Sequence, residues 1–204
     1  MLRVYRIPFS TNVERVALAL GHKGVEVEWV DVDPADRAPV EAVSGQPLVP
    51  VLVEEDGAVV VDSQAILYRL EELFPEPPLF PRGPARRAEL GIFLDWFDRV
   101  WKRPPNVIAL ELERAEPDRE RVARLGAAIR AALDRFESLL DGRDFLFGEF
   151  SAADCAAFPF LKYGLLHDPD DTELFHRILV EHQPLAHPRL EAWIRRVDAR
   201  PRAW

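Results

Sequence analysis

The sequence predicts an α/β domain followed by an all-helical domain, and three observations support this division. Up to about residue 75, short stretches of β-branched and aromatic residues alternate with stretches of helical periodicity, as in a sheet covered by helices. Residues 76–84 are rich in proline, which neither continues a helix nor occupies a central strand, and we interpret them as a linker. Residues 85–204 then show helical periodicity alone. We therefore expect domains at 1–75 and 85–204.

Within the first domain, the hydrophobic pattern predicts the order strand, helix, strand, loop, hairpin and helix. The strands show apolar and polar residues in alternation, and the helices show apolar residues three and four positions apart. The first helix ends in a basic turn followed by Gly24, a common helix terminator. The predicted elements are a strand at 2–7, a helix ending at Lys23, a strand at 25–32, a hairpin of 49–53 and 58–61, and a helix at 63–74.

The second domain is predicted to be a bundle of helices. Ser151 and Asp154 have the spacing of a capping box before an apolar helix. An aromatic stripe on the first helix is expected to pack in the core or a dimer interface, and the wall of a ligand pocket is the alternative. The stripe comprises Phe93, Trp96, Phe97, Val100 and Trp101, and the predicted helices span 85–115, 118–140, 152–166, 172–181 and 188–198.

Composition and charge exclude several classes of function. The net charge of −9 argues against nucleic acid and anionic membranes as partners, because a phosphate backbone requires a basic face. No leader peptide is visible, and no uncharged apolar stretch is long enough for a membrane span. The single cysteine, Cys155, excludes an intramolecular disulfide, so we expect a cytoplasmic protein with this residue buried. The histidines are scattered, and we expect no metal site.

Ser10, Thr11 and Asn12 lie between the first strand and the first helix. One interpretation is helix capping, for which these residue types are suited. The other interpretation is a site that binds and activates a thiol, because a helix N-terminus stabilises an anion such as a thiolate. A free thiol with a pKa near 8.5 is only about 3% ionised at pH 7. A hydroxyl hydrogen bond plus the helix field, lowering that pKa by about one to two units, would make the thiolate a major form.

Two further motifs, taken alone, have a local interpretation. Val49-Pro50 opens a strand, which is a position where proline is tolerated. Asp62-Ser63 opens the helix at 63–74, where an acidic residue is a good N-cap.

In this order and spacing, the three motifs resemble the thiol-binding domain of the cytosolic glutathione transferases, in particular the serine-type, phi/theta-like members. The Ser151–Asp154 box and residues 188–201 also resemble the core helix and last helix of that family, so the resemblance spans nearly the whole chain. It implies a thioredoxin-like βαβ-ββα domain, glutathione as co-substrate, a hydrophobic electrophile as second substrate, and a homodimer. The absence of cysteine near Ser10 excludes CxxC redox chemistry and the cysteine-type relatives.

The resemblance also implies a role for each motif. Ser10 would bind the glutathione sulfur, with Thr11 and Asn12 as alternates. Pro50 would follow a cis peptide bond, and the Val49 backbone would pair with the cysteinyl part of glutathione. Ser63 would bind the γ-glutamyl carboxylate, and Asp62 would bind the ammonium group.

One position departs from the family pattern. Leu48 stands where the family commonly has a lysine or glutamine that reaches the glycyl carboxylate. Losing such a charge-assisted bond typically costs about 1.5–3 kcal/mol. Arg37 or Gln46 are candidates to replace it, although no motif places them. The sequence therefore predicts a glutathione-conjugating enzyme, with two alternatives: a binding or regulatory protein of the same fold, or an enzyme that uses another small thiol.

Overall fold

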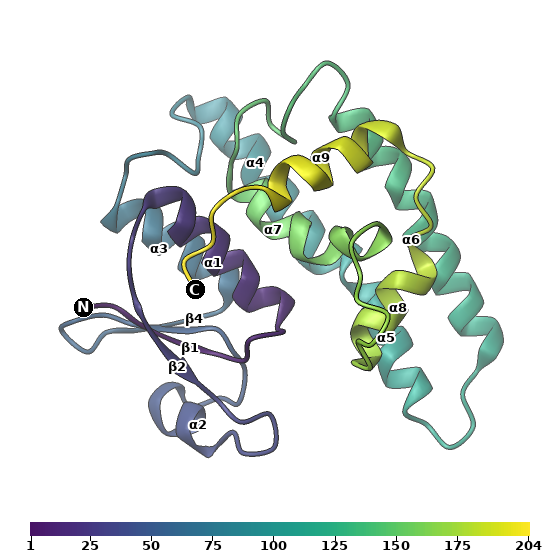
Figure 1. Ribbon diagram of the computed structural model, residues 1–204, viewed down its shortest axis with the longest axis horizontal. Helices are drawn as coiled ribbons and strands as arrows, with labels where there is room; N and C mark the ends of the chain where they lie inside the picture. The colour runs from purple at the N-terminus through teal and green to yellow at the C-terminus, as the bar shows by residue number, and fades with distance from the viewer. The chain divides into compact units, whose positions relative to one another are not determined.

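The computed structural model describes residues 1–204 and divides into two compact units. The first, an α/β unit, contains residues 1–87 together with 199–204, and the second, residues 88–198, is all-helical (Figure 1). These units differ from the expected domain bounds in two places. The proline-rich residues 76–84 pack with the first unit, and residues 199–204 return to it after the last helix.

The first unit is built on a four-stranded sheet with the order β2-β1-β3-β4. β1 and β2 are parallel, and the other neighbouring strands are antiparallel. The βαβ-ββα order and this topology give the thioredoxin-like fold that the resemblance implied. The strands are shorter than predicted: β1 (Arg3–Arg6), β2 (Glu28–Asp31), β3 (Val51–Val53) and β4 (Val59–Val61).

Helices cover both faces of this sheet because its side chains alternate between them. On one face, Tyr5, Val51 and Val53 pack with Val40 of α2 (Ala38–Ser44). α1 (Thr11–Lys23) and α3 (Ser63–Leu73) pack together against the other face, as seen in Figure 1. α1 is buried along most of its length and ends at Gly24, whose φ of 65° is the left-handed conformation that glycine adopts easily.

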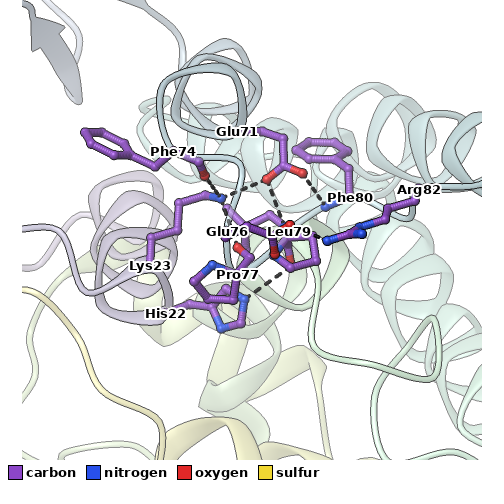
Figure 2. Close-up of polar contacts among 10 residues, drawn as sticks. His22, Lys23, Glu71, Phe74, Glu76, Pro77, Leu79, Phe80 and Arg82 are labelled. Atoms are coloured by element: carbon purple, nitrogen blue, oxygen red, sulfur yellow. Dashed lines mark hydrogen bonds and ion pairs between the residues drawn. The ribbon is translucent and has the colours of Figure 1, made fainter.

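A buried ion pair fastens the proline-rich segment to the first unit (Figure 2). The Nζ of Lys23, at the end of α1, lies 2.8 Å from Oε2 of Glu71 and donates to the carbonyl oxygens of Phe74 and Pro77. Glu71 in turn accepts the backbone N–H of Leu79 at 2.9 Å. These bonds satisfy both buried charges, so the segment is part of the first unit and does not act as a free linker.

The second unit follows the predicted helices with one correction. The helix expected at 85–115 is divided into α4 (Pro84–Trp96), a π-helical turn η1 (Phe97–Trp101) and α5 (Arg103–Leu112). Pro104 and Pro105 lack backbone N–H groups and therefore start a new helix. The remaining elements are α6 (Arg119–Leu139), α7 (Ala152–Leu161), the 3-10 turn η2 (Lys162–Gly164), α8 (Leu174–His182) and α9 (Pro188–Asp198).

The predicted capping box organises the core of the second unit. Asp154, fully buried in α7, accepts the backbone N–H groups of Ser151 and Leu146 and the indole N–H of Trp193, at 2.8–3.0 Å. Burial raises the pKa of Asp154, and these hydrogen bonds oppose that rise. Cys155 is buried as expected. No helix in the structure is both long and apolar enough to cross a membrane.

Candidate functional site

The strand register brings the three predicted motifs to one end of the sheet. Tyr5 pairs with Val51, and Val51 pairs with Val61. Extending the antiparallel register by two residues places Val49 opposite Ile7, shortly before Ser10, and extending it by one places Pro50 opposite Asp62. The β1–α1 junction, the start of β3 and the β4–α3 junction therefore lie together.

Ser10 caps α1 and keeps a proton available. Its φ and ψ of −71° and 122° are extended, and its Oγ accepts the backbone N–H of Val13 at 3.4 Å. A hydroxyl that accepts a hydrogen bond still has its own O–H to donate. Ser10 is half-buried, whereas Thr11, the first residue of the helix, is buried. Capping and thiol activation are thus compatible at Ser10.

Side-chain contacts join the start of α1 to the start of α3. Arg15, buried in α1, donates from Nη1 to Oγ of Ser63 at 3.2 Å. Oγ of Ser63 lies 3.5 Å from Oδ1 of Asn12. No pattern in the sequence predicted this direct contact between Arg15 and a candidate ligand-binding residue. The two helix N-termini are consequently held side by side, with their partial positive charges close together.

Asp62 holds the turn between β4 and α3. Its φ of 74° is the only positive value among the non-glycine residues, and aspartate tolerates it better than most residues. Oδ1 accepts the N–H groups of Gln64 and Ala65 at 2.8 and 3.2 Å, which caps α3. This cap uses Oδ1, so the carboxylate retains Oδ2 as a further acceptor on an exposed residue.

The Val49–Pro50 peptide bond is cis, which confirms that prediction. Pro50 is buried, and Val49 is half-buried, packing against the cluster on the α2 face of the sheet. Val49 precedes β3, which begins at Val51, so it lies just outside the regular ladder of the sheet. Its placement suits the predicted strand-like pairing with an extended ligand.

The segment before Val49 has no cation placed by the family pattern. Leu48 is 69% exposed, and its backbone is bracketed by the Gln46 side chain, with hydrogen bonds of 2.7 and 2.9 Å. The Gln46 amide also donates to Oγ of Ser44. Arg37 precedes α2 and donates from Nε to the carbonyl of Pro34 at 3.0 Å. Both candidate replacements are thus engaged locally.

The aromatic stripe of the second unit packs as a core, as expected. Phe93, Phe97 and Trp101 are buried, and Phe97 stacks on Trp101 with ring centroids 4.6 Å apart. Val100 is exposed and lies outside this core. Phe93 and the half-buried Trp96 also line an apolar pocket of about 640 Å³ between α4 and α6.

Sequence reasoning missed the part that residues 199–204 play in the first unit. Arg202 donates from Nε to Oε1 of Glu14 in the first turn of α1, at 3.0 Å, and both side chains are largely buried. Residues 199–201 end the stretch that resembles the last helix of the family. This segment has no regular secondary structure, and its contacts are with residues at the other end of the chain, so no local pattern predicts them.

Comparisons with known proteins match both units. Residues 4–78 match the model of the glutathione S-transferase N-terminal domain, and residues 119–196 match that of the C-terminal domain. Over 171 residues the chain is 36% identical to FtsZ-localized protein A of Caulobacter vibrioides, covering 76% of this chain and 73% of that protein. The structure of the present chain is similar to that of a glutathione S-transferase from Rhodospirillum rubrum F11, with a TM-score of 0.75 and 28% identity, covering 98% of this chain and 89% of that one. It is also similar to FzlA from C. crescentus, with a TM-score of 0.78, 28% identity, and 98% and 88% covered.

Proposed function

Because this chain belongs to the cytosolic glutathione S-transferase family, we propose that its first unit binds glutathione and that Ser10 activates the thiol for attack on a hydrophobic electrophile. The observation that carries this proposal is the Ser10 hydroxyl at the N-terminus of α1, with its oxygen accepting the Val13 N–H and its proton available. The helix N-terminus favours the anion, and the hydroxyl donates to it.

The γ-glutamyl end of glutathione fits the start of α3. The hydroxyl and backbone N–H of Ser63 provide donors for its carboxylate, because Asp62 already accepts the N–H groups of Gln64 and Ala65, and the exposed Asp62 carboxylate provides an acceptor for its ammonium group. The backbone of Val49, before Pro50, would pair with the cysteinyl part. Arg15 contributes by holding Ser63 at 3.2 Å from its guanidinium.

The part of the site that would bind the glycyl carboxylate lacks a cation. Leu48 offers no charge, and binding there depends on Arg37 or Gln46 giving up a local hydrogen bond. We therefore propose weak glutathione binding. A different small thiol, one without the glycyl carboxylate, would bind the same site without losing a charge-assisted hydrogen bond at that end.

A second candidate function is binding without catalysis. The relative that supports it is FtsZ-localized protein A, whose name places it with FtsZ and 73% of which is covered at 36% identity. In this alternative the chain is a regulatory protein that uses the transferase fold to bind a protein partner. For either function we also propose a homodimer in the cytoplasm, as the family resemblance implies.

Calorimetric titration with glutathione, followed by a conjugation assay with a generic aromatic electrophile, tests these alternatives. Saturable binding with turnover supports the enzyme. Binding without turnover favours the regulatory protein, which should then co-sediment with FtsZ polymers from the same organism. No binding of glutathione, together with turnover in the presence of another small thiol, identifies the third alternative.

A further inference from the structure

The last residues of the chain are attached along α1. The backbone N–H of Ala203 donates to the carbonyl of Ala17 at 3.1 Å, and the indole N–H of Trp29 donates to the carbonyl of Ala203. The approach is so close that a Cβ on Gly21 would lie 2.2 Å from the carbonyl oxygen of Pro201. Figure 1 shows the yellow C-terminal end beside α1. We call residues 199–204 the C-terminal clasp.

The clasp places one cation on the first turn of α1. Nε of Arg202 lies 3.0 Å from Oε1 of Glu14, and the two side chains are 15% and 6% exposed. Arg202 also donates to the carbonyl of Arg200, which fixes its guanidinium. The remaining cations on α1 and the clasp have other partners: Arg15 donates to Ser63, Arg200 donates to His22 at the far end of α1, and Lys23 binds Glu71.

Glu14 is placed where its charge affects an anion at Ser10. The N–H of Glu14 donates to the carbonyl of Ser10 at 3.0 Å, so the two residues are one helical turn apart. At that spacing two positions lie on the same side of a helix. A carboxylate in the first turn also interacts with the positive end of the helix dipole, which is the field that a bound thiolate uses. An uncompensated Glu14 would therefore oppose the thiolate.

We propose that Arg202 is a positioning residue for the thiol site, which keeps the bound thiol ionised by neutralising Glu14. This inference rests on the proposed function and adds a control that lies outside the site itself. The burial of the pair makes the compensation effective, because charges in a largely desolvated environment interact more strongly than charges in water. The far end of the chain thus contributes to chemistry at the first helix.

The test uses three variants of the full chain: Arg202→Gln, Glu14→Gln, and the two combined. The readout is the pKa of glutathione bound to each, measured from the ultraviolet absorbance of the thiolate as a function of pH. We expect Arg202→Gln to raise this pKa by about half to one unit, a three- to tenfold loss of thiolate well below the pKa. Glu14→Gln should lower it, and the double variant should return near the unmodified value.

The opposite signs of the single variants separate electrostatics from structure. If the pair only stabilised α1, both single variants would raise the pKa and the double variant would not recover it. Arg202→Lys, which keeps the charge, is the matched control and should stay near the unmodified protein. If the unmodified protein binds glutathione with a lowered thiol pKa but the single variants shift in the same direction, this inference is wrong and the proposed function stands. If the unmodified protein does not lower the thiol pKa, both are wrong.

Discussion

At the scale of single residues, the Ser10 hydroxyl caps α1 and, in the proposed function, also activates a thiol. Its oxygen accepts a helix N–H, and its proton remains for a ligand. Loss of the cap should cost about 1 kcal/mol of unfolding free energy, as at other helix N-termini. Loss of the donated hydrogen bond should instead raise the pKa of the bound thiol. The two effects are measured separately.

Ser10→Ala should raise the pKa of the bound thiol and reduce turnover by about ten- to a hundredfold at pH 7, with thiol affinity nearly unchanged. The reason is that the hydroxyl binds the thiolate better than the neutral thiol. The deficit should shrink as pH rises toward about 9, because the thiol then ionises without help. Steady-state rates across this pH range provide the measurement.

Thr11→Ala and Asn12→Ala are the matched controls for Ser10. Thr11 is buried, and Asn12 lies 3.5 Å from Ser63 Oγ, so neither is expected to reproduce the pH-dependent deficit. If Thr11→Ala loses turnover while Ser10→Ala keeps it across the pH range, the activating hydroxyl belongs to Thr11.

Leu48→Lys should tighten glutathione binding by about tenfold or more, because it adds a charge-assisted hydrogen bond to the glycyl carboxylate. The exposed side chain at this position leaves room for the longer lysine. Calorimetric titration measures the change, and Leu48→Met controls for the added length without charge. Equal affinities for the lysine variant and the unmodified protein would mean that another residue already binds the glycyl end.

At the scale of elements, the connection between α5 and α6 is organised by one buried carboxylate. Glu111 accepts the backbone N–H of Asp118 at 3.0 Å and lies 2.8 and 3.0 Å from the guanidinium groups of Arg114 and Arg121. Asp118 in turn caps α6 by accepting the N–H of Arg121. These contacts, led by the Asp118 N–H, hold the pKa of Glu111 below its usual 4.5.

Glu111→Gln should therefore destabilise the protein in a pH-dependent way. A carboxylate whose pKa is lowered on folding stabilises the folded state above its ordinary pKa and loses that effect as pH falls through the lowered value. The difference in urea midpoint between the unmodified protein and the variant should be largest at neutral pH and shrink below pH 4.5. Glu113→Gln is the control, because Glu113 is exposed and lies at the end of the same helix. Its urea midpoint should differ little from that of the unmodified protein at either pH.

Elements with strong local signals were predictable from the sequence. The N-caps at Ser10 and Asp62 and the Ser151–Asp154 box each depend on residues within a few positions, and all are present. The division of the 85–115 helix was missed, although Pro104 and Pro105 were visible, because apolar periodicity continues across them. Arg15 lies in the helix that was predicted to end at Lys23, but its partner Ser63 is brought near only by the packing of α1 on α3.

At the scale of the whole molecule, the contacts that local patterns cannot reveal are those between distant segments. The sequence predicted a free linker at 76–84, yet Lys23 and Glu71 bind it to the first unit through buried bonds. Nothing in the sequence predicted the C-terminal clasp. Each of the three motifs of the candidate site was predictable from the sequence. Their meeting at one end of the sheet could be seen only from the strand register.

Gly21→Ala should displace the clasp. The added Cβ would meet the backbone carbonyl of Pro201 at 2.2 Å, and backbone atoms yield less easily than the end of a side chain. We expect the amide of Ala203, which donates to Ala17, to exchange with solvent about tenfold faster or more. Hydrogen exchange measures this. Gly83→Ala, where an added Cβ meets nothing within 4 Å, is the control and should leave the exchange unchanged.

The clasp also affects the order in which the protein can be made. Residues 1–87 are synthesised before residues 88–198, but their contacts with residues 199–204 can form only after all of 88–198 has been synthesised. Until residues 199–204 have been synthesised, Glu14 cannot pair with Arg202, and the surface of α1 around Ala17 and Gly21 is not covered by the clasp. The α/β unit therefore gains these contacts only after residues 88–198 have been synthesised, although most of its residues precede them in the chain.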